Sequence, residues 1–254
     1  METINMPSCN DATLIPYSPN AQNPWNTTKV KHVYRRLGFG AKQMDVDAAL
    51  SLSPGDFIDN LVDTAANEPQ TPAPTWGYWS LSNYTDYFPE VAQQVIDWRV
   101  QTVYDFMNEN LHGRLTLFWM NHFVTELEVY GHSPYMFQYY NKIQTHSLGN
   151  VKEFVREIGI SSTMLMYLNG FENTNINPNE NYARELFELF TLGENNGYTQ
   201  DDILETARAL TGYNHRDEYG DTIYFDSSTF DNGEKTIFGQ TGFWGYDDVI
   251  DILF

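Results

Sequence analysis

The chain has 254 residues with 34 acidic and 14 basic side chains, which gives a formal net charge of −20. Nucleic acids and anionic membranes are bound by clustered Lys and Arg, so this balance argues against both as partners. An aromatic content of 15% argues against a disordered acidic chain, because such chains lack the large rings of a core. Cys9 is the only cysteine, which excludes an internal disulfide and cysteine-based zinc or iron–sulfur sites.

The N-terminal residues carry no recognisable membrane or export signal. No apolar run in the chain approaches the ~20 residues of a membrane span. Residues 1–20 lack both the basic and the apolar region of a signal peptide. From these residues alone, the protein is either cytoplasmic or its export signal is missing from this chain or lies elsewhere. Residues 1–27 are rich in proline and polar residues without a period, and we expect an irregular arm there.

Helical periodicity begins after this arm and dominates most of the chain. Thr27 or Thr28 is expected to cap the first helix. Ser53-Pro54-Gly55-Asp56 predicts another helix start, because it has an N-cap hydroxyl, Pro at N1 and an acid at N3. Thr199-Gln200-Asp201-Asp202 is a capping box that predicts the start of a later helix.

Residues 67–89 form a Pro-rich aromatic segment that precedes a strong helical pattern from Pro89. Loops of this length are uncommon without a role. Two interpretations are open: an aromatic loop laid over the core, or a binding surface. The aromatic residues of the segment are Trp76, Tyr78, Trp79, Tyr84, Tyr87 and Phe88.

The pattern changes from helical to extended near the C-terminal end. Residues 222–225 and 235–238 resemble short strands, and Asp231-Asn232-Gly233 between them is a hairpin turn signal. We therefore expect one β-hairpin within the acidic segment 217–240.

The expected fold is mainly α, with a multi-helix bundle-like domain over residues 28–254 and the small β-hairpin near its C-terminus. Residues 247–254 start an amphipathic helix without a C-terminal cap, so we expect the domain to be incomplete at this end.

Histidine and carboxylate residues are the candidates for chemistry, because no Gly-rich phosphate loop, nucleophile elbow or zinc-protease helix occurs. His122, His146 and Glu185 come from three predicted helices and can hold a divalent metal with open positions. Arg184 and Glu188 complete the candidate catalytic set. The alternative is that both histidines are structural donors and that the glutamates pair with arginines or face solvent.

Two further carboxylate groups have simple structural explanations. Glu180 lies at a predicted helix N-terminus, and helix capping alone explains it. Asp226, Asp231 and Glu234 suggest a calcium site, but their spacing does not fit an EF-hand loop, so a solvated acidic surface is favoured.

Several strings in this order and spacing resemble the bacterial domain-of-unknown-function family numbered 1800. The longest and most specific is NENYARELFELFTLG at 179–193, followed by GYTQDDILETARALTGY. The other matching strings are VKHVYRRLGFG (30–40), RLTLFWMNHF (114–123) and HSLGNVKEFV (146–155).

The resemblance implies a mainly α-helical protein that is exported, and therefore periplasmic or extracellular. It also implies genes that neighbour a sulfatase- or phosphatase-like protein, which makes that protein a possible partner. No general activity is established for the family, so no mechanism or cofactor follows from it.

The chain departs from the family pattern in three ways. It lacks the export signal, and it stops at DDVIDILF where the family continues into a further helical part. Phe230 stands where the family often has His, directly before Asp231. A site that uses this histidine is altered here.

Two functional hypotheses follow. The favoured one is an exported or cell-envelope protein that binds a partner or a glycan through its aromatic segment and acidic face. The alternative is a hydrolase-type enzyme, with a His/Glu site between helices that holds a metal or activates water.

Overall fold

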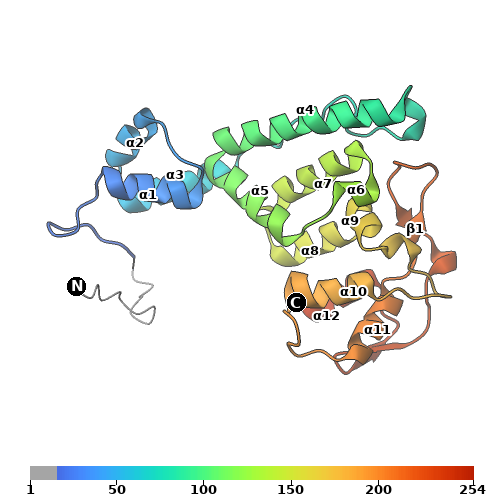
Figure 1. Cartoon of the computed structure of the whole chain (residues 1–254). Coiled ribbons are helices and arrows are strands. Elements are labelled where there is room, and N and C mark those ends of the chain that lie inside the picture. Colours follow the sequence, from blue (N-terminus) through green and yellow to red (C-terminus); the bar gives the residue numbers. More distant parts are fainter. Residues whose placement is uncertain (1–15) are drawn as a thin grey trace, which may run out of the picture.

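A computed structural model describes residues 16–254 and shows a mainly α-helical architecture (Figure 1). This confirms the expected fold class. The α-helices are α1 (Thr27–Leu37), α2 (Gln43–Leu50), α3 (Pro54–Ala66), α4 (Tyr87–Asn108), α5 (Asn110–His122), α6 (Leu127–Tyr130), α7 (Ser133–His146), α8 (Val151–Gly159), α9 (Ser162–Tyr167), α10 (Asn181–Glu185), α11 (Gln200–Ala209) and α12 (Tyr246–Leu253). The strands are β1 (Tyr213–His215), β2 (Tyr224–Phe225), β3 (Lys235–Ile237) and β4 (Gln240–Gly242).

The expected irregular arm lies partly outside the described residues, and residues 16–26 contain no helix or strand. The first helix is capped by Asn26, whose side chain accepts from the Lys29 N–H, so the expectation of Thr27 or Thr28 is wrong by one or two residues. Ser53 and the Thr199 capping box are confirmed as helix starts. These caps were predictable because each is made by residues within one turn.

Helices α1–α3 pack around a small core of their own at one end of the molecule (Figure 1). Its buried members are Val30, Tyr34, Val46, Ala49 and Phe57.

The main core lies in the rest of the chain, where α5, α7, α8 and α10–α12 meet. Phe123, Phe154 and Phe187 are among its fully buried side chains. Helix α4 is the longest described helix and lies along one edge of this body, beside α5 and α7 (Figure 1). No described helix is both long and apolar enough to cross a membrane.

The β-structure differs from the expected single hairpin. Two separate two-stranded antiparallel sheets form, β1 with β2 and β3 with β4. Residues 222–225 and 235–238 therefore do not pair with each other, and the expected turn at Asp231-Asn232-Gly233 joins no hairpin. The tight turn lies instead at Phe238-Gly239, where both residues have positive φ, as the hairpin of β3 and β4 requires.

Candidate functional site

The three predicted metal ligands, His122, His146 and Glu185, lie in different surroundings. His122 ends α5, and its Nε2 lies 3.2 Å from the Phe190 carbonyl oxygen. His146 ends α7 and stacks on Phe154, and burial lowers its pKa. Within residues 16–254, no three His, Cys, Asp or Glu side chains are grouped as a metal ion requires. His122, His146 and Glu185 therefore do not form such a group in that part of the chain.

Arg184 forms ion pairs with two carboxylates, one before it and one after it in the chain. It lies 3.1 Å from Glu180 and 3.3 Å from Glu188, one turn away on either side. Glu180 makes no side-chain cap bond; it also accepts from Gln200 Nε2 at 2.7 Å. Glu180 is therefore the N-cap residue of α10, as expected, but its side chain pairs with Arg184 and Gln200 instead of capping the helix. The three charged side chains are partly exposed, so their pairing contributes little stability.

Glu185 is not part of the ion pairs that Arg184 forms with Glu180 and Glu188. Burial raises its pKa, and the neighbouring Glu188 carboxylate adds to the effect. Directly after it, residues 186–191 form a π-helical turn, a rare geometry that often marks functional sites. The contact between His122 and Phe190 ties α5 to the same turn. The raised pKa and the adjoining π-helical turn keep Glu185 as a candidate acid or base among the predicted residues.

The aromatic segment 67–89 mainly covers the core. Trp76 is buried, and Tyr84 and Tyr87 are half-buried, where they pack against each other and against His132. Only Tyr78 and Phe88 among its aromatic residues are exposed, at 71% and 81%. The segment itself is thus a covering loop with two projecting rings, rather than a continuous aromatic platform.

The exposed apolar surface lies instead on the outer side of α4. We define the α4 surface as Phe88, Ile96, Val100, Val103, Tyr104 and Met107, whose exposed fractions range from 54% to 81%. Positions 96, 100, 103 and 107 follow the 4-3-4 spacing of one helix face. Scattered surface hydrophobics are ordinary, but a contiguous row of this kind indicates an interaction site.

Hydrogen bonds of two buried polar side chains fix the orientation of α4, with its apolar row facing outward. Asp105 is buried and accepts from the Thr71 hydroxyl at 2.8 Å and from the Tyr140 hydroxyl at 3.0 Å. Gln94 is also buried and accepts from the Tyr84 and Ser133 hydroxyls. A rotation of α4 that buried its apolar row would break these bonds and leave buried polar groups unpaired.

A buried histidine extends this polar network at the junction of α4 and α5. His112 Nδ1 lies 3.0 Å from Glu109 Oε2, and its Nε2 lies 3.2 Å from the Gln144 carbonyl oxygen. Burial lowers the pKa of His112, but the hydrogen bonds to Glu109 and Gln144 outweigh it, so the pKa is raised above 6.5. Sequence reasoning missed His112, because a polar residue on a predicted helix ordinarily faces solvent.

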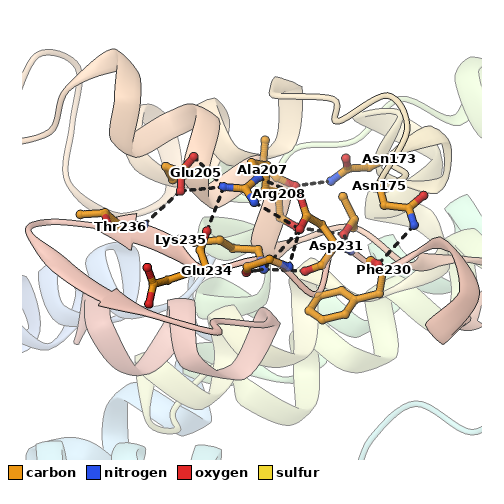
Figure 2. Close-up of polar contacts among 12 residues, drawn as sticks. Asn173, Asn175, Glu205, Ala207, Arg208, Phe230, Asp231, Glu234, Lys235 and Thr236 are labelled. Atoms are coloured by element: carbon orange, nitrogen blue, oxygen red, sulfur yellow. Dashed lines mark hydrogen bonds and ion pairs between the residues drawn. The ribbon is translucent and has the colours of Figure 1, made fainter.

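The acidic C-terminal segment contains an ion cluster rather than a calcium site. Figure 2 shows Arg208 lying between Glu205 and Asp231, with Nε 2.8 Å from Asp231 Oδ2. Lys235 is only 1% exposed and donates to the Asp231 and Gly233 carbonyl oxygens. Asp231 is thus occupied by cations of the chain itself, which contradicts a solvated acidic surface at this position.

Carboxylates of α11 also satisfy the backbone of the neighbouring strand. Glu205 accepts from the Thr236 N–H at 3.0 Å (Figure 2), and Asp202 accepts from the Phe238 N–H at 2.7 Å. These bonds attach β3 to α11, so the cluster around Arg208 has a structural role in joining the two elements.

Comparison with known proteins identifies the family. The model of the family described as "Protein of unknown function (DUF1800)" matches residues 32–254. A search of curated proteins and a search of solved structures find no match to this chain. The family match covers the α4 surface, the π-helical turn and the Arg208 cluster alike. The chain therefore belongs to the DUF1800 family of proteins of unknown function.

Proposed function

We propose that this chain is a binding protein and that the α4 surface is its docking site for a protein partner. The single observation that carries the proposal is the apolar row at positions 96, 100, 103 and 107, exposed on a helix that buries the polar side chains of Gln94 and Asp105. This orientation is held by the bonds of Asp105 and Gln94, so the surface is present without any rearrangement.

The spacing of the row favours an amphipathic helix as the partner's contacting element. Apolar residues at 4-3-4 spacing form the seam by which two helices pack. The charge of −20 favours a partner with basic side chains beside its apolar face and disfavours a second copy of this chain.

We further propose that binding takes place outside the cytoplasm, as the family resemblance implies. The sulfatase- or phosphatase-like protein that the resemblance places nearby is the first partner to test. A glycan is a weaker candidate, because only Tyr78 and Phe88 of the aromatic segment project from the surface.

The experiment compares partner capture by three forms of the purified chain. The test variant is Val100→Glu/Met107→Glu. The matched control is Ile176→Glu/Phe243→Glu, which changes two exposed apolar residues away from α4. We expect the native chain and the control to retain one identified protein that the α4 variant loses, and purified partner to reproduce the difference in Kd. Equal binding by all three forms contradicts the proposal, as does a dimer of the native chain that the α4 variant abolishes.

The hydrolase alternative retains one specific observation, the raised pKa of Glu185 beside the π-helical turn. A carboxyl group with a raised pKa is suited to act as a general acid. Elemental analysis of the purified protein tests the metal-dependent form of this alternative. One equivalent of bound metal supports it, and a metal-free active protein contradicts it.

A further inference from the structure

Helices α4–α7 line an open cavity of about 370 Å³ beside the α4 surface, and Val103 belongs to both. Its volume falls within the range of about 300–1,000 Å³ typical of ligand pockets. The cavity opens to the surface beside Val103 and Arg99, two exposed residues of α4, so a ligand can enter it without unfolding of the helices. Rings and thioethers make up much of its wall, contributed by Trp98, Met120, Phe123, Tyr130, Met136 and Tyr139.

The wall is apolar in character because several of its hydroxyl groups bond to the protein. The Tyr139 hydroxyl donates to the Phe123 carbonyl oxygen at 2.7 Å, and the Tyr140 hydroxyl donates to Asp105. Thr102 donates to the carbonyl oxygen of Trp98, one turn earlier in α4. Water in such a space finds few partners, so an apolar group displaces it favourably.

One charged side chain borders the cavity among the described residues. Arg99 is exposed at its edge, and no ion pair of the described part of the chain includes it. A guanidinium pairs bidentately with a carboxylate. In a chain of net charge −20, this cation gives the edge of the cavity a local preference for an anion.

We propose that the cavity binds an amphiphile with an apolar body and one anionic head, such as a medium-chain carboxylate. The apolar body lies among the rings of Trp98, Phe123 and Tyr139, and the head pairs with Arg99. This proposal does not rest on the partner-binding function, since a ligand in the cavity needs no protein on α4.

Calorimetric titration of the whole chain with decanoate and with decan-1-ol tests the proposal. The two probes share an apolar chain and differ in charge at one end. We expect Arg99→Gln to weaken decanoate binding about tenfold, or ~1.4 kcal/mol, and to leave decan-1-ol binding unchanged. The matched control Arg35→Gln removes an exposed cation of α1 that does not border the cavity. It should bind both probes as the native chain does.

A second variant places a ring inside the cavity. Thr102 is half-buried and bonds only to its own helix, so Thr102→Phe fills space without leaving a distant partner unpaired. We expect it to lose binding of both probes while its thermal unfolding midpoint stays within a few degrees of the native value. Absence of decanoate binding to the native chain overturns the proposal. Equal binding by Thr102→Phe, or an unchanged preference for decanoate in Arg99→Gln, also overturns it.

Discussion

Asp231 shows how one carboxylate joins two elements of the fold. Arg208 of α11 donates to both of its oxygens, and the Gly233 N–H donates to Oδ1. Its side chain is 17% exposed, and the Lys235 ammonium lies 4.0 Å from Oδ1. The pairing with Arg208 holds the pKa of Asp231 below its usual 3.8.

We predict that Asp231→Asn lowers the free energy of unfolding by about 2 kcal/mol at neutral pH, because it removes the charge-assisted hydrogen bonds to Arg208, which keeps Glu205 as its other counter-charge. The native contribution is present above pH 3.8 and is lost as the pH falls through the lower folded-state pKa. Urea denaturation between pH 7 and pH 3 measures both effects. The control Asp63→Asn changes an exposed carboxylate of α3. Equal stability losses in the two variants contradict this role of Asp231.

Single residues were predictable where their partners are close in sequence. Ser53 and Thr199 cap helices through bonds made within one turn. The pairing of Asp231 with Arg208 spans 23 positions, and no local pattern contains it. Nearness in sequence is not sufficient, however: the Phe230 ring lies 5.0 Å from the ammonium of Lys235, five positions later, in a cation–π contact that spacing alone does not indicate.

A close crossing of elements occurs where α8 ends. A Cβ atom at Gly159 would collide with the hydroxyl groups of Tyr182 and Tyr246, which belong to α10 and α12. The Tyr246 hydroxyl donates to the Arg156 carbonyl oxygen of α8 at 2.7 Å, so it is not free to move away. Glycine at this position therefore lets three helices meet.

We predict that Gly159→Ala destabilises the protein by about 1–3 kcal/mol, the usual cost of overpacking a core. Thermal unfolding followed by circular dichroism measures the loss. Gly55→Ala is the control, because its added Cβ would meet only the Ser53 hydroxyl at an ordinary distance of 3.8 Å. An unchanged midpoint in Gly159→Ala would show that α8, α10 and α12 are not packed as described.

The type of an element, helix or strand, was easier to predict from the sequence than the side of it that faces the core. The helical period of α4 is clear in the sequence, but apolar residues occur on both of its sides. Its outward face is decided by Asp105 and Gln94, whose partners lie in α7 and the aromatic segment. The predicted strand pairing was wrong because pairing also depends on contacts beyond the local sequence. The structure pairs β2 with β1, which follows α11, rather than with β3.

At the scale of the whole molecule, the charge of −20 and the α4 surface act together in the proposed function. In this proposal, like charge disfavours pairing of two copies of the chain, while the apolar row remains available to a basic partner. The candidate site was only partly predictable. The aromatic segment contributes only Phe88 to the α4 surface, and the apolar row at 96–107 becomes visible only once the packing of α4 is known.

Hydroxyl-radical footprinting of the chain with its partner tests the central claim most directly. Met107 on α4 and Met44 on α2 are 74% and 71% exposed, so both oxidise readily in the free protein. The α4 surface predicts that partner binding slows oxidation of Met107 and leaves Met44 unchanged. Equal oxidation of Met107 in the free and bound protein, or protection of Met44 alone, contradicts the assignment of α4 as the docking site.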